Sequence, residues 1–301
     1  MKKKKIKSWQ RRPYALYIIT ALVLLFLLLP IIIVVPMSFT SGTLLHFPPE
    51  GFSFRWYEKF FQDKQWIDSA LVSIRAAFGT MIVSVLLGTV ASVGLAKKIM
   101  GKSKWVKVVL QIPMMIPAVI VAVSMYLVFG KYKILGKMWV IILAHSCLAI
   151  PYVVTLTTAA LQGLDASQYD AARVLGANHF QATVKVVLPL IKTAIFSSCL
   201  FAFITSFDES VLVLFITKTK TLTLPRMMYA DLKYGISPAL ASVSTLLICT
   251  TLTFFLLSKV IASMSPDAKA ARKQAKIEKE LFKLEIKKRE QEAAIAEQAK
   301  K

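Results

Sequence analysis

Six long apolar runs constrain what this chain can fold into. They cover 15–37, 70–96, 106–129, 138–160, 193–216 and 239–261 of a 301-residue chain that is 56% hydrophobic. A helix of about 20 apolar residues crosses a bilayer core of about 30 Å, so each run is long enough to span one. Helix is required because lipid offers exposed backbone groups no hydrogen-bond partner. The sequence predicts an all-α, multi-pass membrane protein with six transmembrane helices.

Basic residues predict how these helices are oriented. Lysines occupy positions 2 to 5 of the basic segment 1–14, and five more lie in 97–107, between the second and third runs. Cytoplasmic loops carry an excess of Lys and Arg, so both termini should be cytoplasmic. The first run is too long for a secretion signal and no cleavage site follows it, which indicates an uncleaved anchor. Topology and anionic lipid headgroups account for the net charge of +22 better than nucleic acid does.

A polar segment between the fourth and fifth runs, 163–190, carries the most specific motif. Its members are Asp170, Ala171, Ala172, Gly176, Val186, Leu188 and Pro189. This segment resembles the cytoplasmic coupling loop of bacterial ABC-importer permeases, where Glu-Ala-Ala is followed after three residues by Gly and after nine more by Ile-x-Leu-Pro. Asp170 and Val186 replace the Glu and the Ile. The resemblance implies a MetI-like type I permease fold, and it implies that Asp170, Ala171, Ala172, Gly176, Leu188 and Pro189 contact a separate ATPase.

The same segment predicts a compact pair of short helices. Asp165 or Ser167 supplies an N-cap, and Asp170 is expected in the first turn, where the helix dipole favours an anion. Gly176 is expected to end this helix or let it turn back. A second helix should run from 178 to 187 and stop before Pro189. Apolar residues are expected on the edges of the pair: Val174, Leu175, Phe180, Val184 and Val187.

Two adjacent carboxylates, Asp208 and Glu209, lie within the fifth apolar run. An unpaired carboxylate inside the bilayer costs on the order of 3 kcal/mol or more, so each should face protein, water or a cation. Three interpretations remain open: a lining of the substrate path, a structural pair or helix cap, and a contact with a partner subunit. His145, in the fourth run, is expected to be a hydrogen-bonded packing residue.

A narrower resemblance covers about 52–261. Its motifs are Ser206-Phe207-Asp208-Glu209, Thr223-Leu224-Pro225, Met228-Tyr229 and Ile236-Ser237-Pro238. Together they resemble the second permease of spermidine/putrescine-type ABC importers. The resemblance implies a polyamine solute, with an aminoalkylphosphonate as the alternative. It further implies a bacterial inner membrane, two ATPase copies, an extracytoplasmic binding protein and a second permease, in a heterodimer or alternatively a homodimer.

Missing motifs exclude other classes of protein. The sequence has no Gly-x-x-x-x-Gly-Lys-Ser/Thr loop, so ATP must be bound by a partner and no cofactor is expected here. Cysteines and histidines are not paired at metal-ligand spacing, and no catalytic residue is predicted. A secondary transporter is the alternative from a different class, but the sequence shows no convincing internal repeat.

Three further expectations concern the rest of the chain. An aromatic segment, 52–61, should form a short helix at the outer membrane interface, as an anchor or as a docking surface. Pro113, Pro117 and Pro151 should bend their helices. The permease domain is expected over 15–262, and 263–301 should form a charged cytoplasmic helical tail, either solvated or assembled as a coiled coil.

Overall fold

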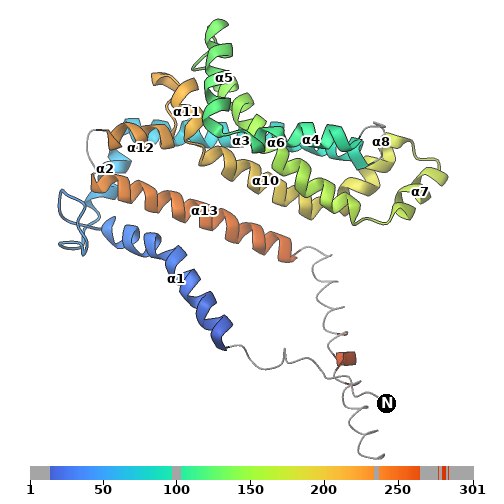
Figure 1. Cartoon of the computed structure of the whole chain (residues 1–301), viewed down its shortest axis with the longest axis horizontal. Coiled ribbons are helices and arrows are strands. Elements are labelled where there is room, and N and C mark those ends of the chain that lie inside the picture. The colour runs from blue at the N-terminus through green and yellow to red at the C-terminus, as the bar shows by residue number, and fades with distance from the viewer. Residues whose placement is uncertain are drawn as a thin grey trace, which may run out of the picture. The chain divides into compact units, whose positions relative to one another are not determined.

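The computed structural model describes residues 14–96, 103–233 and 237–264, with residues 277, 280–282 and 284 of the C-terminal segment. The expected tail, 263–301, and the basic segment 1–14 therefore lie almost wholly outside the described residues. Every regular element among the described residues is a helix, which confirms the predicted fold class. The elements, labelled in Figure 1 where there is room, are α1 Tyr14–Met37, α2 Arg55–Gln62, α3 Lys64–Ala96, α4 Ser103–Met115, α5 Ala118–Lys131, α6 Met138–Gln162, α7 Ala166–Val174, α8 His179–Ala182, the π-helix η2 Thr183–Val187, α9 Leu188–Leu190, α10 Lys192–Phe207, α11 Val211–Ile216, the 3-10 helix η3 Thr219–Thr221, α12 Leu224–Leu232 and α13 Pro238–Met264.

Four of the described helices are individually long and apolar enough to cross a membrane: α1, α3, α6 and α13. Two bent pairs raise the number to six if each pair counts as one span. The first pair joins α4 to α5 with a bend of 95°, and the second joins the run His179–Leu190 to α10 with a bend of 76°. The segment 106–129 is thus broken between α4 and α5, and 193–216 is divided between α10, which ends at Phe207, and α11, which begins at Val211, so neither is one continuous helix.

Pro117 explains where the first pair breaks. Pro117 directly precedes α5, and its ψ of 130° is extended and not helical. Proline has no N–H to donate to a helix, and it disfavours helical conformation in the residue before it. Pro113 and Pro151 lie inside α4 and α6, which continue through them. The interruption is therefore at Pro117, the only one of the three prolines at which a helix stops.

The described chain divides into two compact units. Of the described residues, the first unit contains those within 14–74 and 217–250, and the second contains those within 75–216 and 251–264. In the first unit, residues of α2, α3, α12 and α13 form an apolar core: Phe60, Trp66, Leu224, Leu240 and Val243. The Ser73 hydroxyl accepts a 2.8 Å hydrogen bond from the Leu224 N–H, which ties α3 to the start of α12. A short helix expected within 52–61 is present here as α2.

In the second unit, α6 packs along α10, and α5 packs against α11. One core cluster joins α3, α5, α6 and α11: Ala76, Ala122, Ile141, Ala144, Leu212 and Ile216. Small residues allow α3 and α6 to approach closely, as is common between membrane helices. A Cβ atom added to Gly88 would lie only 2.7 Å from Cγ1 of Val153. Within this unit, α7 and α8 lie at the opposite end from α5 and α11 (Figure 1).

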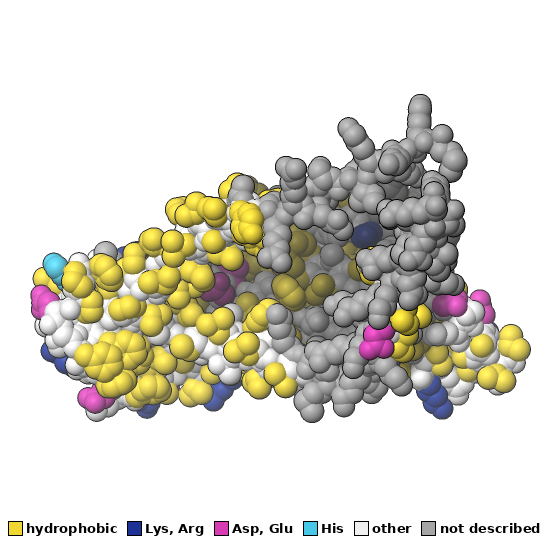
Figure 2. Space-filling view, turned by 90° about the horizontal axis from the view of Figure 1, so that it is seen from below, with side chains coloured by type: hydrophobic (Ala, Val, Ile, Leu, Met, Phe, Trp, Pro, Cys, Tyr) yellow, Lys and Arg dark blue, Asp and Glu magenta, His cyan; other side chains and the backbone are white. Residues whose placement is uncertain are grey.

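Apolar side chains cover most of the described surface in Figure 2. The most apolar stretch of α1 has no buried residue, and Phe26 within it is 76% exposed. In water such a surface would be a large unsatisfied patch, whereas lipid is as apolar as these side chains. The exposed apolar faces support a multi-pass membrane protein.

We expect Gly88→Ala to lower stability and Gly94→Ala not to. The added methyl at Gly88 would collide with the stiff, β-branched Val153, whereas a Cβ at Gly94 would meet nothing within 4 Å. Overpacking of this kind costs about 1–3 kcal/mol, whereas Gly to Ala in an open helix position is neutral or favourable. Thermal unfolding in detergent measures the difference, and equal midpoints for the two variants would contradict the close approach of α3 and α6.

Candidate functional site

The polar segment 163–190 folds as the predicted helix pair. Asp165 caps α7, and its Oδ1 accepts a 3.0 Å hydrogen bond from the Ser167 N–H. The sequence left Asp165 and Ser167 open as caps, and the structure selects Asp165. Because α7 starts at Ala166, Asp170 is not in its first turn as expected, and the dipole argument for its charge does not hold.

Gly176 ends α7 in the left-handed conformation, with φ of 87°. The Gly176 N–H donates to the Arg173 carbonyl and the Ala177 N–H donates to the Ala172 carbonyl, each at 3.1 Å. This pair of bonds is a Schellman motif, which closes a helix end and favours glycine at the left-handed position. Nothing lies within 4 Å of an added Cβ, so glycine is required here by the backbone and not by lack of space.

The second helix begins at a capping box and continues further than expected. Asn178 accepts from the Gln181 N–H at 2.8 Å, and Gln181 Oε1 accepts from the Asn178 N–H at 3.0 Å. The helical run does not stop before Pro189 but reaches Leu190. A π-turn over Thr183–Val187, closed by the Leu188 N–H on the Thr183 carbonyl, precedes the proline. Proline clashes with the carbonyl four residues back, and a π-turn is one way to shift that carbonyl.

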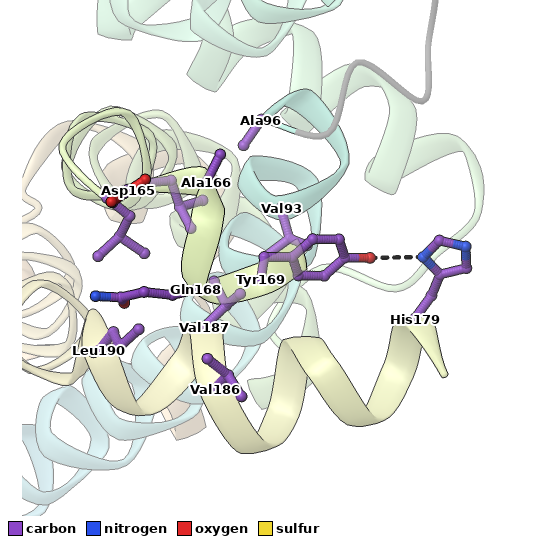
Figure 3. Close-up of a pocket in the computed structure, with 12 residues that line it drawn as sticks. Val93, Ala96, Asp165, Ala166, Gln168, Tyr169, His179, Val186, Val187 and Leu190 are labelled. Carbon is purple, nitrogen blue, oxygen red and sulfur yellow. Dashed lines mark hydrogen bonds between the residues drawn. The ribbon is translucent and has the colours of Figure 1, made fainter. Parts of the chain in front are cut away.

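An aromatic pair joins the two helices. The Tyr169 hydroxyl lies 2.6 Å from Nδ1 of His179, and the two rings stack at 6.4 Å between centroids (Figure 3). Arg173 also spans the turn, donating from Nη1 to the Ala177 carbonyl at 2.6 Å. Sequence reasoning missed the pair because the tight turn at Gly176, and not a helical period, brings positions 169 and 179 together.

The helix pair exposes apolar side chains at its turn. Val174 is 87% exposed, Leu175 88% and Phe180 75%, whereas Val187 is buried. Of the predicted coupling residues, Asp170, Ala171, Gly176 and Pro189 are exposed, while Ala172 and Leu188 are half-buried. A rigid, polar element that holds large apolar side chains in the open is typical of a surface that another protein covers.

A cavity of about 670 Å³ lies behind the helix pair, within the second unit. Its lining comes from the ends of α3 and α6, from the Asp165 cap, from α7, and from the run His179–Leu190 (Figure 3): Val93, Ala96, Leu161, Leu164, Asp165, Ala166, Gln168, Tyr169, His179, Val186, Val187 and Leu190. No sequence signal pointed to it.

The acidic pair lies in a turn and not inside a helix as expected, since α10 ends at Phe207 and α11 begins at Val211. Glu209 Oε1 accepts hydrogen bonds from the N–H groups of Val211 (2.7 Å) and Leu212 (2.9 Å). Glu209 is thus a helix cap, one of the open interpretations. Asp208 is exposed, and its carboxylate has no hydrogen bond or ion pair among the described residues.

His145 is a hydrogen-bonded packing residue, as predicted. It is 1% exposed, and its Nδ1 lies 2.7 Å from the Ser206 hydroxyl. Ser206 donates to the Thr80 hydroxyl at 3.2 Å, and Thr80 donates to the Ile142 carbonyl at 3.4 Å. This chain of bonds ties α3 and α6 to the last turn of α10, immediately before Asp208. Among the described residues, no group of three His, Cys, Asp or Glu side chains could hold a metal ion.

Comparison with known proteins identifies relatives over most of the chain. Residues 88–265 match the family described as binding-protein-dependent transport system inner membrane component. The spermidine/putrescine transport system permease protein PotC of Haemophilus influenzae is 30% identical over 236 residues, which cover 78% of this chain and 91% of that protein. The putrescine transport system permease protein PotI of Escherichia coli K12 is 29% identical over 231 residues, 74% of this chain and 82% of that protein.

Solved structures share the fold at lower identity. A chain of a bacterial ABC transporter involved in the import of alginate matches with a TM-score of 0.64 and 18% identity, covering 86% of this chain and 99% of that chain. A chain of the methionine ABC transporter MetNI matches with a TM-score of 0.56 and 18% identity, covering 66% and 97%. These likenesses confirm the expected permease fold.

We expect Glu209→Ala to destabilise the protein and Glu209→Gln to be close to wild type. The Ala variant leaves the first N–H groups of α11 without an acceptor, which costs about 1 kcal/mol, whereas Gln keeps an acceptor oxygen. Thermal unfolding in detergent measures this loss. Asp208→Ala is the matched control, because that carboxylate caps nothing. If Glu209→Ala and Asp208→Ala unfold at the same temperature, Glu209 is not a cap.

Proposed function

Because the chain belongs to the family of binding-protein-dependent transport system inner membrane components, we propose that it forms half of the translocation path of an ABC importer for a polyamine. Spermidine and putrescine are the proposed solutes. The observation that carries the coupling role is the exposed helix pair, fixed by the left-handed turn at Gly176. Relatives whose names specify these solutes, at 29–30% identity, support the choice of a polyamine.

The helix pair is built to transmit a displacement. The Asp165 cap, the Gly176 turn, the Asn178 capping box and the Tyr169–His179 pair hold its two helices together. The run His179–Leu190 then continues into α10 with only Ile191 between them. Because a helix is stiff along its axis, movement of the exposed turn reaches α10 and the Asp208 turn at its far end. A partner that grips Val174, Leu175 and Phe180 can therefore move the translocation path.

Energy must come from a partner subunit, since the sequence contains no phosphate-binding loop. The proposed importer contains two copies of an ATPase, one on each permease, a second permease that makes a heterodimer, and an extracytoplasmic binding protein that delivers the solute. The helix pair must then face the cytosol, with both termini of the chain on the same side. The excess of lysines in the N-terminal segment and in 97–107 supports this orientation.

Asp208 is the proposed contact for a cationic solute. Its carboxylate is exposed and is not used by any hydrogen bond or ion pair among the described residues. The His145–Ser206–Thr80 chain fixes the last turn of α10 and with it the direction of Asp208. An ionisable group at this depth of a membrane protein marks a pathway when no structural partner holds it.

Uptake into vesicles tests the function. We expect saturable, ATP-dependent uptake of radiolabelled spermidine or putrescine only when this chain, its partner permease, the ATPase and the binding protein are all present. If an assembled complex hydrolyses ATP in response to 2-aminoethylphosphonate and not to polyamines, the proposed solute is wrong and the proposed permease role stands. Uptake that continues without the ATPase would contradict the importer.

Gly176→Ala should uncouple ATP hydrolysis from transport. A left-handed alanine costs about 1 kcal/mol, so the turn that fixes the helix pair is weakened while the membrane helices are unaffected. We expect the number of solute molecules transported per ATP to fall about five-fold. Gly163→Ala is the matched control, because Gly163 has φ of −82° and an added Cβ would make only ordinary contacts. Equal transport ratios in the two variants would argue against coupling through this turn.

Asp208→Asn should raise the KM for a polyamine and leave complex assembly unchanged. The substitution keeps the size of the side chain and removes the charge that attracts an ammonium group. Uptake kinetics measure KM, and co-purification of the subunits measures assembly. An unchanged KM would remove Asp208 from the solute path.

A further inference from the structure

The cavity behind the helix pair has apolar walls. Apolar side chains line it from the end of α3, from the end of α6 and the loop that follows, and from the run His179–Leu190: Val93, Ala96, Leu161, Leu164, Val186, Val187 and Leu190. Its volume of about 670 Å³ falls within the range of small-molecule sites, about 300–1,000 Å³. The cavity is partly open to its surroundings, so a molecule can enter it and bury apolar surface against these walls.

Polar groups lie on one side of this cavity, at the start of α7. In Figure 3 the Asp165 carboxylate and the Gln168 amide lie apart from the Tyr169–His179 pair, whose facing atoms bond to each other. Asp165 is exposed, and its carboxylate accepts hydrogen bonds from the Ser167 backbone N–H, which caps α7, and from the Ser167 hydroxyl; both lower the pKa of Asp165. None of the described lining residues is Lys or Arg. The cavity therefore has apolar walls that fit a hydrocarbon body and one acidic side chain at one end.

The cavity lies where two membrane helices end. α3 ends at Ala96 and α6 at Gln162, and both helices are candidate membrane spans. At 33 and 25 residues they are longer than the roughly 20 residues that cross a hydrocarbon core, so their ends can reach the headgroup region. Apolar chains and polar head groups are both present at this depth. An occupant with an apolar body and a polar head could enter from the leaflet or from the cytosol.

We propose that this cavity binds an amphiphile with a long apolar body and a primary ammonium head group, which pairs with Asp165. Phosphatidylethanolamine and free alkylamines both belong to this class. Binding itself stands on the cavity alone. Its consequence rests on the proposed coupling role: an occupant fills the space between the helix pair and the ends of α3 and α6, and so stiffens the transmission of movement to α10.

Binding is tested on the purified importer complex with decylamine as the probe and decanol as its neutral match. Native mass spectrometry should show one decylamine per copy of this chain, bound more tightly than decanol. Asp165→Asn should abolish that preference, an affinity loss of at least about five-fold for decylamine. Asn is as good an N-cap as Asp, so α7 is retained.

Asp63→Asn is the matched control. Asp63 also accepts a hydrogen bond from the N–H two residues on, at 2.8 Å, but it does not line the cavity. It should leave decylamine affinity unchanged. Ala166→Phe places a ring in the cavity and should prevent binding of decylamine and decanol alike. If Asp165→Asn and Asp63→Asn bind decylamine as tightly as wild type, or if Ala166→Phe still binds it, the proposed site is wrong.

The source of the amphiphile is decided by lipid exchange. If the site takes a lipid, phosphatidylethanolamine in nanodiscs should displace decylamine. Phosphatidylcholine should not displace it, because its head group has no N–H donor. Displacement by neither lipid assigns the site to free alkylamines. Binding of neither decylamine nor phosphatidylethanolamine would overturn the proposal. Because these readouts do not involve transport, a complex that binds decylamine but transports no polyamine would contradict the proposed function alone.

Discussion

The absence of hydrogen-bond partners in lipid is the constraint on which this structure depends. It forces the chain into helices, and it requires every interruption of a helix to be satisfied by the protein itself. Glu209 does this at the break between α10 and α11, where its carboxylate takes the first two N–H groups of the next helix. His145 Nδ1, Ser206 and Thr80 are linked by hydrogen bonds across three helices beside the same break. Glu209 and this group of three residues thus place hydrogen-bonding side chains where the backbone departs from a straight helix.

The helix pair also satisfies its backbone N–H and C=O groups at the helix ends, with several capping interactions close together in the sequence. The helix pair, from the Asp165 cap to Leu190, is short, yet it carries an N-cap, a Schellman turn, a capping box and a hydrogen-bonded aromatic pair. Isolated helices of nine and four residues would not be stable, since nucleation is costly and short helices lack propagation. Their local hydrogen bonds therefore hold apolar side chains such as Phe180 in the open, in a fixed arrangement. The cost of exposing them is offset only when a partner covers them.

Much of this could be predicted from composition and spacing. Hydropathy located the four helices that are individually long and apolar enough to span a bilayer, and the fixed intervals to Gly176 and Pro189 located the helix pair. The sequence did not reveal that α10 ends at Phe207 or that Pro189 lies inside a helical run. A hydropathy window averages the hydropathy of side chains and carries no information on where the backbone bends or a helix ends. The Tyr169–His179 pair and the cavity behind it depend on how the chain folds back at Gly176, which no periodicity encodes.

Coupling through the helix pair requires the run His179–Leu190 and α10 to move as one rigid element. Its most direct test is the distance between spin labels at the exposed positions Lys185 and Phe201, on either side of the 76° bend at Ile191, in an importer freed of its native cysteines. Double electron–electron resonance should give the same narrow distance distribution in the nucleotide-free and ATP-trapped complexes. A distance that changes with nucleotide would show that the bend flexes, and would contradict transmission through a rigid element.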